Sequence, residues 1–596
     1  MNVKTSLEMS KDISKPEQLI TEHIDIWTSA ILPKSTSGRG SSKKYELYGI
    51  SKLRELILEL AVRGKLVPQD ANDESASILL EKIAVEKAQL IKDKKIKKPR
   101  TLPKFIKEDE PFELPLGWEW CLLLDIGHDW GQKNPDTDFT YIDVGSIDKK
   151  LGLIENADVL NADNAPSRAR KIVKKGTVIY STIRPYLLNI AVVNREFEPE
   201  PIASTAFSII HPLDGISSSF VYRYLRSPSF VSYVESCQTG IAYPAINDKQ
   251  FFSGLIPIPP TNEQHRIVAK VDELMMLCDQ LEQQTEASID AHATLVEVLL
   301  ATLTDSTDSD ELAQNWARIS EHFDSLFTTE QSIEALKQTV LQLAVMGKLV
   351  PQNPEDEPAS VLLEKIAEEK EQLIQDKKIK PRKALPPIEN EEKLFDLPLG
   401  WEWCRLDDIC DGITSGSTPP KNSFIDETGI PYLKVYNIRN QKIDFEYQPQ
   451  FIEESYHSSS LKRSQLCPGD VIMNIVGPPL GKIAIIPDTY PQWNCNQAIV
   501  MFRPFISDLN KFIYTYLVSG MFLDKIALIG TAGQDNISVT KSRAILLPTP
   551  PLAEQLRIVA KIDELMAICD QLKEKIRQSQ ETQVQLTDAL VDQALG

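Results

Sequence analysis

The chain contains two copies of several sequence blocks, and this repetition constrains its architecture more than any other feature. The segment ELAVRGKLVPQ from Glu59 recurs as QLAVMGKLVPQ from Gln342, and ELPLGWEWC recurs as DLPLGWEWC, both 283 residues later. A further block, PIPPTNEQHRIVAKVDELMMLCDQL from Pro257, recurs from Pro548 as PTPPLAEQLRIVAKIDELMAICDQL, 291 residues later. We therefore expect one structural frame that occurs twice.

Between these blocks lie two segments, residues 121–256 and 404–547, that resemble each other only faintly. If a tandem duplication had simply diverged, the two copies would differ along their whole length. A repeated frame with unlike inserts therefore indicates that the frame performs the same task twice, while each insert performs a task of its own. We expect five regions: an N-terminal helical frame (1–110), a first variable domain (111–260), a central helical frame (261–390), a second variable domain (391–551) and a C-terminal helical frame (552–596).

The order of the blocks predicts a circular arrangement. The C-terminal block repeats the first half of the central frame, whereas the residues before Leu114 repeat its second half. Even PEQLITEHIDIWTSAIL near the N-terminus loosely echoes DELAQNWARISEHFDSLF near Asp310. The two ends of the sequence should together rebuild a copy of the central frame, and the termini should lie near each other.

The frame is predicted to be helical. Thr261 and Gln264 form a capping-box pattern, and apolar residues then recur at spacings of three and four. Such a narrow stripe is typical of a coiled-coil seam, and the alternative is an amphipathic helix packed on its own domain. The stripe consists of Ile267, Val271, Leu274, Leu277 and Leu281 in one copy and Ile558, Ile562, Leu565, Ile568 and Leu572 in the other.

The variable domains have a different pattern. Short β-branched and aromatic runs such as GTVIYSTI, STAFSII, GDVIMNIVG and NQAIVMF are broken by Gly and Pro, which predicts strands in mixed α/β domains. SSSFVYRYLRS and DLNKFIYTYLVSG read as helices late in each domain, and STSGRGSSKK (35–44) as a flexible linker. The predicted fold class is α+β, with two mixed α/β domains separated by long helices.

Composition excludes some classes of protein. No apolar run approaches the roughly 18 residues of a membrane span, and the start MNVKTSLEMSKD lacks the apolar core of a signal peptide, so we expect a cytoplasmic protein with no membrane association. The eight cysteines show no CxxC spacing, which argues against a zinc finger or a disulfide framework. The net charge of −20 argues against a DNA-coating protein but leaves room for local basic surfaces.

One family shows the same succession of motifs. A GDVI-like strand, a strand at NQAIV, a late helix, a small loop (TGIAYPAIND or TAGQDNIS) and a PxPPxxEQxxI helix start resemble the target-recognition domain of Type I restriction-modification specificity (HsdS-like) subunits. The resemblance covers nearly the whole chain, twice. The first domain departs from the family's usual GD-V pattern, because it has KKGTVIYSTIRP instead.

The resemblance implies a non-catalytic DNA-specificity subunit. Each variable domain would read one half of a bipartite double-stranded DNA target. The helices would form an antiparallel coiled-coil spacer in a pseudo-twofold arrangement on which two methyltransferase (M) subunits dock, with nuclease/translocase (R) subunits joining in a full restriction complex. No cofactor would bind this chain. S-adenosylmethionine would belong to the methyltransferase partner, and ATP and Mg to the nuclease partner.

The lack of catalytic motifs in the sequence supports this expectation. The chain has neither a Gly-rich cofactor loop with an NPPY-type segment nor an HExxH motif, so we expect no catalytic and no metal-ligating residues. The alternative of a nuclease rests on Pro135-Asp136 followed by Asp148-Lys149-Lys150, which formally fits a PD...DxK metal site. A second alternative is a helical scaffold whose inserted domains bind proteins.

Candidate DNA contacts are Arg, Lys, Asn, Gln and Tyr residues in or beside predicted loops, because these side chains contact phosphates and base edges. The partner-docking helices are marked by Ile267, Val271, Leu274, Leu281, Ile558, Ile562, Leu565 and Leu572. The runs KDKKIKKPR from Lys92 and DKKIKPRK from Asp376 are further candidates for phosphate contacts. The candidate DNA contacts are Arg168, Arg170, Lys171, Arg184, Tyr186, Tyr243 and Asn247 in the first domain, and Lys434, Tyr436, Asn437, Arg439, Asn440, Lys482, Gln534, Asn536 and Lys541 in the second.

Overall fold

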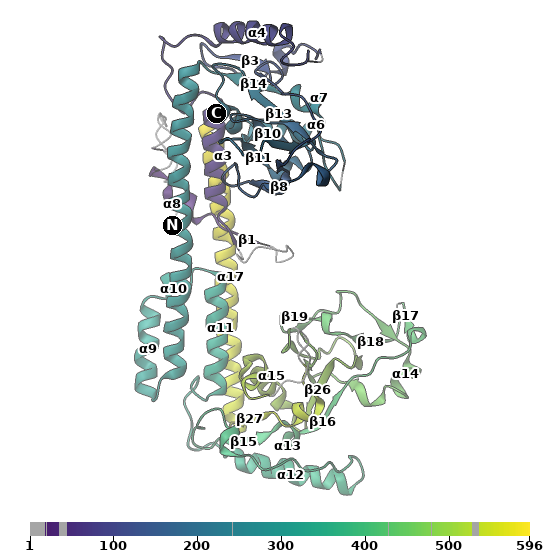
Figure 1. Ribbon diagram of the computed structural model, residues 1–596. Helices are drawn as coiled ribbons and strands as arrows, with labels where there is room; N and C mark the ends of the chain where they lie inside the picture. Colours follow the sequence, from purple (N-terminus) through teal and green to yellow (C-terminus); the bar gives the residue numbers. More distant parts are fainter. Residues whose placement is uncertain are drawn as a thin grey trace. The chain divides into compact units, whose positions relative to one another are not determined.

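A computed structural model describes residues 18, 21–34, 45–99, 101–240, 242–426, 428–477, 479–526 and 536–596 of the chain. The chain divides into two compact units (Figure 1). Unit 1 consists of residues 1–288 and 579–596, and unit 2 of residues 289–578. Unit 1 is thus assembled from both ends of the sequence, as the circular order of the repeated blocks predicts. The linker predicted at 35–44 lies outside the described residues.

The frame of unit 1 is centred on helix α3 (Tyr48–Val62). Its buried Leu53 shares one core with Val271 of α8 (Thr261–Asp305) and Leu590 of α17 (Leu552–Leu595). Polar contacts tie α3 and the turn after it to the end of α17: the Tyr48 hydroxyl donates to Asp588 at 2.7 Å and Lys65 Nζ to the Leu595 carbonyl at 2.7 Å. The segment 579–595 is therefore an integral part of unit 1.

The frame of unit 2 repeats this design around helix α11 (Glu330–Val345). Here Lys348, the equivalent of Lys65, donates to the carbonyls of Thr304 (2.7 Å) and Ser306 (2.8 Å) at the end of α8. A cationic side chain thus satisfies the last carbonyls of a long helix in each unit, which is favourable at the negative end of the helix dipole. The similarity between the N-terminal segment and the residues near Asp310 also has a structural counterpart. Helix α2 (Ile24–Ser29) begins directly after His23, and helix α10 (Phe323–Leu326), which comes after α9 (Ser309–Glu321), begins directly after His322.

The apolar stripes of α8 and α17 pack with residues of other frame helices in units 1 and 2, in agreement with the predicted helical spacer. Ile267, Val271 and Leu274 are fully buried in unit 1, and Ile558 is fully buried in unit 2. One detail of the prediction was wrong: Leu277 and Ile568 are 38% and 44% exposed, and Cys278 and Cys569 are buried instead. The true spacing is therefore 4-3-4-3, a regular heptad pattern that the larger apolar side chains next to the cysteines obscured.

The predicted capping box at the start of α8 is also wrong. The Thr261 hydroxyl donates to the Gly215 carbonyl at 3.1 Å, and Gln264 Nε2 donates to the Pro259 carbonyl at 3.0 Å. Gln264 Oε1 in turn accepts from the Ser217 backbone N–H at 2.8 Å. These side chains therefore attach the long helix to the first variable domain instead of satisfying the helix's own first turn.

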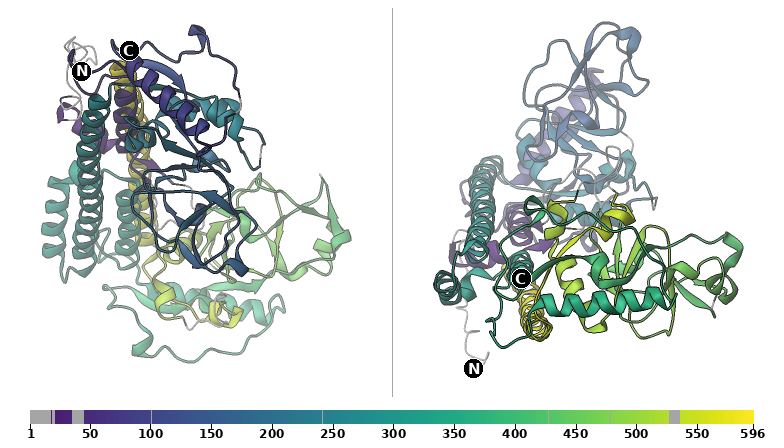
Figure 2. Two further views of the ribbon diagram at one scale, coloured as in Figure 1. Left: turned by 45° about the horizontal axis from the view of Figure 1, so that its top comes forward. Right: turned by 90° about the horizontal axis from the view of Figure 1, so that it is seen from below.

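The first variable domain holds two four-stranded sheets with strand orders β11-β10-β13-β4 and β8-β5-β12-β9. The domain is drawn in blue in the two views of Figure 2. A β3-β14 pair joins the chain's entry and exit strands, with Leu122 opposite Leu255. The elements are β3 (Glu119–Leu122), β4 (Gly127–His128), β5 (Phe139–Ile142), β6 (Ile147–Asp148), β7 (Leu153–Ile154), β8 (Asp158–Leu160), β9 (Ala169–Ile172), β10 (Val178–Ser181), β11 (Ile190–Val192), β12 (Pro201–Ser204), β13 (Phe207–Pro212), α5 (Ser218–Tyr224), α6 (Pro228–Cys237), α7 (Asp248–Phe252) and β14 (Leu255–Ile258).

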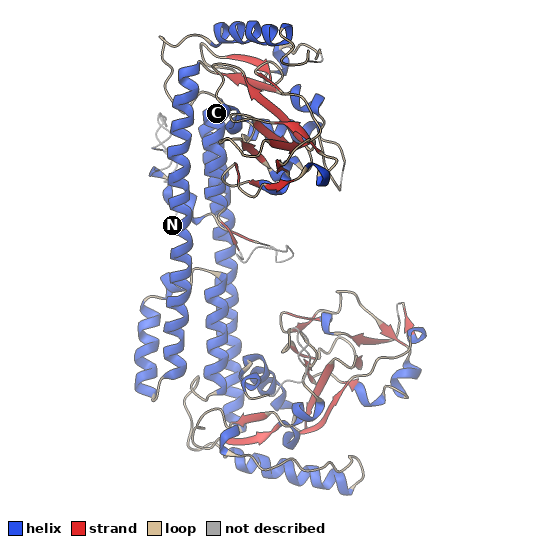
Figure 3. Cartoon of the chain, in the orientation of Figure 1, coloured by secondary structure: helices blue, strands red, loops and turns tan. Residues whose placement is uncertain are grey.

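The second variable domain repeats the first sheet and the closing pair, as β16-β26-β23-β24 and β15-β27. Its other large sheet has five strands, β17-β21-β18-β25-β22 (Figure 3). The elements are β15 (Glu402–Arg405), α13 (Leu406–Ile409), β16 (Cys410–Ser415), β17 (Phe424–Ile425), β18 (Ile430–Leu433), β19 (Ile438–Arg439), β20 (Lys442–Ile443), β21 (Phe451–Ile452), α14 (Glu454–Ser458), β22 (Gln465–Leu466), β23 (Val471–Asn474), β24 (Ile483–Ile485), β25 (Trp493–Cys495), β26 (Ile499–Pro504), α15 (Asn510–Ser519), α16 (Val539–Arg543) and β27 (Leu546–Thr549).

A matching helix precedes each variable domain: α4 (Ala76–Lys92) in unit 1 and α12 (Ala359–Gln375) in unit 2. Leu79 and Ile83 of α4 are buried in the core of unit 1, and Leu362 and Ile366 of α12 in that of unit 2. The small pair β1 (Leu32–Pro33) and β2 (Tyr45–Glu46) completes the described strands.

Helix α8 is long and apolar enough, by length and composition alone, to cross a membrane, with a mean hydropathy of 1.2 in its most apolar window. The later part of the helix contributes Val296, Leu300 and Leu303 to a buried core of unit 2. Only 17% of that window is buried inside the structure, so packing in this core accounts for part of the apolar character of α8.

Candidate nucleic-acid interface

Loops gather at one edge of the β11-β10-β13-β4 sheet. Strand β10 ends at this edge, and β11 and β13 both begin there, because β10 runs antiparallel to its two neighbours. The loop 182–189 therefore lies beside Thr205 and Ala206, and a bridge between Ile183 and Ala245 adds residues 239–240 and 242–247. We call these segments loop edge 1.

Loop edge 1 displays aromatic and cationic side chains to solvent. Tyr186 and Tyr243 are 50% and 68% exposed. The guanidinium of Arg184 lies 4.8 Å from the ring centre of Tyr243, and the Arg184 N–H donates to the Pro244 carbonyl at 2.8 Å. Three candidates that are separated by up to about sixty positions in the sequence thus form one surface group. Arg184 also has a φ of +49°, in the left-handed region, so the loop holds it in a conformation that non-glycine residues rarely adopt.

The other first-domain candidates lie next to this edge. Arg168 accepts from the Thr205 N–H at 2.8 Å through its carbonyl, and its side chain and that of Arg170 are exposed. Lys171, in contrast, is only 5% exposed and pairs with Asp248 at 3.3 Å. Asn247 caps α7 by accepting from the Gln250 N–H at 3.0 Å. Lys171 and Asn247 therefore hold the local structure together, while Arg168 and Arg170 remain open to a ligand.

Loops meet at the equivalent edge of the β16-β26-β23-β24 sheet. The ends of β16 and β23 and the starts of β26 and β24 lie there, so the segments 416–420, 475–477, 479–482 and 496–498 adjoin this edge. A bridge between Val476 and Asn536 corresponds to the Ile183–Ala245 bridge of the first domain. These described segments form loop edge 2, to which Lys482 and Asn536 belong.

The loop after β18 adjoins loop edge 2, because the Asn496 N–H donates to the Leu433 carbonyl at 3.0 Å. Arg439 and Asn440 in this loop are exposed, and the Arg439 guanidinium lies 4.2 Å from the ring centre of Tyr447. Lys434 lies 5.9 Å from the ring centre of Tyr436. Asn437 is 1% exposed and donates to the Tyr447 carbonyl at 2.9 Å, so it shapes the loop from inside.

Two further candidates belong to the segment before β27. Lys541 lies in α16, which begins after the cap residue Ser538. Gln534 lies outside the described residues.

Sequence reasoning missed several polar residues at or beside loop edge 2. Gln497 is exposed and accepts a hydrogen bond from the Thr418 hydroxyl, and Arg463 donates to the Ser417 hydroxyl at 3.2 Å. Gln441 accepts from the Ile483 N–H at 2.7 Å and so connects the loop after β18 to the start of β24. Gln497 directly follows the NCN stretch that enters β26, so its place before a predicted strand was an available signal.

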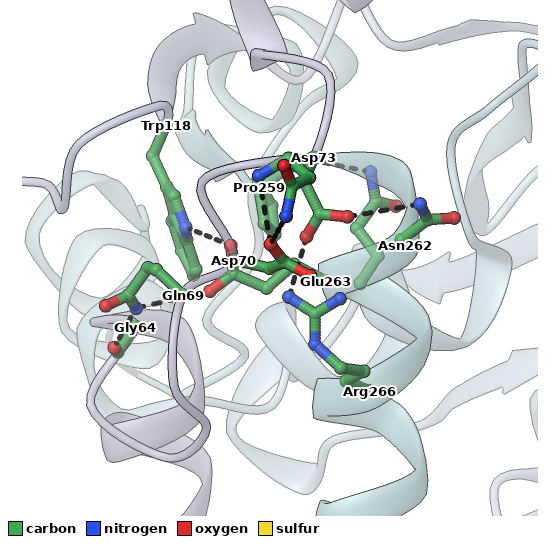
Figure 4. A network of polar contacts seen from close by, with 11 residues as sticks. Gly64, Gln69, Asp70, Asp73, Trp118, Pro259, Asn262, Glu263 and Arg266 are labelled. Carbon is green, nitrogen blue, oxygen red and sulfur yellow. Dashed lines mark hydrogen bonds and ion pairs between the residues drawn. The ribbon is translucent and has the colours of Figure 1, made fainter.

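A polar network that occurs in both units joins each variable domain to its frame, and Figure 4 shows the copy in unit 1. Glu263, at the start of α8, accepts from Trp118 Nε1 at 3.0 Å and from Gln69 Nε2 at 3.2 Å. Arg266 pairs with Asp73 at 2.7 Å. Burial raises the pKa of Glu263, although the hydrogen bonds from Trp118 and Gln69 act in the opposite direction.

Unit 2 contains the same network. Glu554 accepts from Trp401 at 3.1 Å and from Gln352 at 3.3 Å, and Arg557 pairs with Asp356 at 2.5 Å. The glycine of the GKLVPQ block is also explained: Gly347 has a φ of +73°, and a Cβ there would lie 2.5 Å from Pro398. The repeated blocks are therefore the parts that hold a variable domain on a helix.

Comparison with known proteins agrees with this division into frame and variable domains. The family model described as Type I restriction modification DNA specificity domain matches residues 131–291 and 398–581. The chain is 42% identical to the Type I restriction enzyme EcoAI specificity subunit of Escherichia coli, over 97% of this chain and 100% of that protein. The chain belongs to the specificity subunits of Type I restriction-modification systems.

Other relatives lead to the same assignment. The EcoEI specificity subunit of Escherichia coli is likewise 42% identical over 97% of this chain and 100% of its own length. A chain from a solved structure of a type I R-M system is 24% identical, covers 81% of this chain and 99% of that chain, and has a TM-score of 0.51, which supports the fold. As a Type I specificity subunit, the chain contributes DNA target recognition and is not itself catalytic.

The residues of the nuclease alternative serve local structure in this specificity subunit. Asp148 accepts from the backbone N–H groups of Lys150 (2.8 Å) and Leu151 (2.9 Å), and these bonds lower its pKa. Asp136 lies 3.6 Å from Lys133. Across the described residues, His, Cys, Asp and Glu side chains form no group of three or more that could hold a metal ion.

A histidine pair in the first variable domain of this specificity subunit gives a pH-dependent prediction. Burial, with the nearby charges of His128 and Lys174, lowers the pKa of His211 to about 4. Thr177 Oγ1 lies 3.0 Å from His211 Nδ1. The unfolded chain binds a proton near pH 6.5, while the folded domain does not until about pH 4. Stability should therefore decrease as the pH falls through this interval.

The His211→Gln variant should lose much of this acid sensitivity. Unfolding of unit 1 by urea, followed between pH 7 and pH 4, measures it, and the imidazole proton shifts of His211 in NMR spectra report its titration directly. Titration of His211 near its ordinary pKa of about 6.5 would contradict the prediction.

Proposed function

We propose that this specificity subunit recognises a bipartite DNA target, with loop edge 1 contacting one half-site and loop edge 2 the other. The observation that carries the proposal is the equivalence of the two edges: the same strand ends of the same sheet support both, yet their side chains differ. Two equivalent sheet edges that carry different loops are suited to binding two different half-sites of one DNA molecule.

The chemistry of the exposed residues supports base and phosphate contacts. Arginine donates two hydrogen bonds to guanine, and glutamine or asparagine pairs with adenine in the major groove. Arg184, Tyr186 and Tyr243 at loop edge 1, and Arg439, Asn440 and Gln497 at loop edge 2, supply such groups together with aromatic surface. Arg168, Arg170, Lys482 and Lys541 are placed to contact phosphates in this proposal, whereas Lys171 and Asn437 position the loops.

The duplicated frame supports two copies of one partner, and we propose two methyltransferase subunits. The named stripe residues of α8 and α17 are largely buried in their own units, so a partner would use other faces of these helices. Met276, Leu295 and Val298 are 60%, 50% and 57% exposed on α8. In this proposal S-adenosylmethionine is bound by the methyltransferases, ATP and Mg by nuclease subunits where these join, and the assembly acts in the cytoplasm without a membrane.

Exchange of a variable domain tests the proposal. Residues 404–547 would be replaced by the corresponding segment of another Type I specificity subunit, because the β15-β27 pair brings the two ends of this segment together. We expect one half of the methylated target to change and the other half to stay the same. Mapping of methylated sites in cells that carry the hybrid and the methyltransferase measures both halves at once.

A reciprocal exchange of residues 121–256 is the matched control and should change the opposite half-site. A change of both halves in either hybrid would contradict independent recognition. If the domains bound proteins and not DNA, as in the scaffold alternative, neither exchange would alter the methylated sequence.

A further inference from the structure

A basic pocket lies between the turn that follows α4 and the first variable domain. The pocket has a volume of about 380 Å³ and is lined by Ile91, Lys94, Lys95, Ile96, Lys97, Lys98, Trp130, Gly131 and Gln132. Four of the nine lining residues are lysines and none is acidic. The described structure gives these lysines no ion pair, although the whole chain carries a net charge of −20.

The backbone turn creates this concentration of charge. Helix α4 ends at Lys92, and Lys94 takes a left-handed φ of +58° that reverses the chain. Ile96 is 7% exposed and anchors the turn, so the flanking lysines remain exposed around it. Because Ile96 anchors the turn, the backbone brings the four lysines together in one short segment that lines a single pocket.

Trp130 forms the opposite wall. Its indole Nε1 is buried and has no hydrogen-bond partner among the described residues, and Lys174 Nζ lies 3.9 Å from the centre of its ring. Lys174 therefore places a further cation against the indole ring that lines the pocket. A pocket with four lysines and a cation behind its aromatic wall suits an anionic ligand rich in acceptor oxygens.

The pocket is connected to the candidate DNA contacts. Gln132 forms a bridge with Lys171 of β9, and the Lys133 N–H donates to the Arg170 carbonyl at 3.0 Å. Arg168 and Arg170 are exposed on this side of the domain, and Arg168 adjoins loop edge 1. A nucleic acid bound at loop edge 1 therefore has cationic groups beside it that continue toward the pocket.

The equivalent place in unit 2 lacks this excess of positive charge. A pocket of about 210 Å³ is lined there by Lys370, Ile374, Ile379, Lys380, Arg382, Cys410 and Asp411. Arg382 pairs with Asp407 at 3.2 Å, and Lys378 pairs with Asp376 at 3.4 Å. Lys370 Nζ donates to the Asp407 carbonyl at 2.8 Å. Carboxylates and a carbonyl thus already satisfy several of the cations.

We propose that the Lys94–Lys98 pocket binds the phosphodiester backbone of DNA next to the half-site of the first variable domain, and that its counterpart in unit 2 does not. The inference rests on the proposed function and adds an asymmetry to it. The subunit would hold DNA more firmly, and with more salt dependence, on the side of the first domain. Lysine contacts to phosphate carry no sequence information, so the pocket would affect affinity and leave the target sequence unchanged.

Two matched variants of the full chain test this asymmetry. The first changes Lys94, Lys95, Lys97 and Lys98 to Gln, and the control changes Lys377, Lys378, Lys380 and Lys383 to Gln. Binding to a duplex that contains the complete target would be measured over a range of salt concentrations. We expect the first variant to bind DNA about tenfold more weakly than the native chain. The slope of the logarithm of the binding constant against the logarithm of the salt concentration should become shallower by about 2 in this variant, whereas the control keeps the native slope.

Replacement of charged phosphates in the DNA by neutral analogues shows where the lysines contact the backbone. Methylphosphonates placed beside the half-site of the first domain should weaken binding of the native chain and have little further effect on the first variant. Equal effects of the two lysine variants, or an unchanged slope in the first, would overturn the inference and leave the proposed function intact. Failure of the native chain to prefer its target duplex would instead count against the proposed function.

Discussion

Replacement of Trp401 by alanine is expected to destabilise unit 2 by about 3–5 kcal/mol. The side chain is 5% exposed, packs edge-on against Phe512 at 6.2 Å and donates its indole N–H to the buried Glu554. Removal leaves a cavity under the GKLVPQ turn and a buried carboxylate that keeps only the hydrogen bond from Gln352. Hydrogen exchange of backbone amides in each unit measures the free energy of opening separately for units 1 and 2.

Two variants separate packing from hydrogen bonding at this position. Trp401→Phe keeps most of the apolar volume and removes the N–H donor, so we expect a smaller loss of about 1–2 kcal/mol. Trp118→Ala is the matched change in unit 1, where Trp118 donates to Glu263, and it should lower protection there instead. Equal losses for the Ala and Phe variants of Trp401 would show that the hydrogen bond, and not packing, dominates.

Arg543→Phe is expected to destabilise unit 2 by about 3–5 kcal/mol, because it removes the main partner of a buried carboxylate. Asp407 is 6% exposed and is contacted by Arg543 through Nε at 2.7 Å and through a second nitrogen at 2.8 Å. Burial by itself would raise the pKa of Asp407, but the hydrogen bonds and charge of Arg543 outweigh it, and the pKa lies below its ordinary value. Urea denaturation at neutral pH measures the loss.

Unit 1 supplies the compensating change. At the two equivalent positions it has Leu124 and Phe252, whose backbone groups are hydrogen-bonded at 3.3 Å. The double variant Asp407→Leu/Arg543→Phe copies this apolar pair, so it should return to within about 1 kcal/mol of the native chain. A double variant as unstable as Arg543→Phe alone would show that the surroundings in unit 2 cannot accept the apolar pair.

The repeated blocks made the frame predictable from the sequence. Two copies of a motif report which positions are equivalent, and the pairs Arg266–Asp73 and Arg557–Asp356 confirm that equivalent residues make equivalent contacts. The circular order of the blocks likewise predicted that both ends of the sequence build one unit. The heptad register was less accessible, because a buried cysteine beside an exposed leucine is not distinguished by hydrophobicity alone.

The interface was predictable only in part. Residue type identified Arg184, Tyr186 and Tyr243 as candidates, but it could not tell that Lys171 and Asn437 are buried, since lysine and asparagine are usually exposed. Gln497 was missed although it directly precedes a predicted strand, because its neighbour Thr418 at the sheet edge comes from a distant segment of the chain. The topology of the fold decides which side chains lie together at a sheet edge, and local sequence patterns do not reveal that topology.

The way unit 1 is assembled has a consequence for synthesis on the ribosome. Domains generally fold as units while the chain emerges, N-terminal parts first. All of unit 2 lies within residues 289–578, so it has its complete sequence before residues 579–596 are made. Unit 1 begins to emerge first, yet the α17 residues that cover α3, including Leu590, are translated last. The first part of unit 1 therefore cannot complete its fold until after unit 2 has been synthesised, and part of the apolar surface of α3 stays uncovered until then.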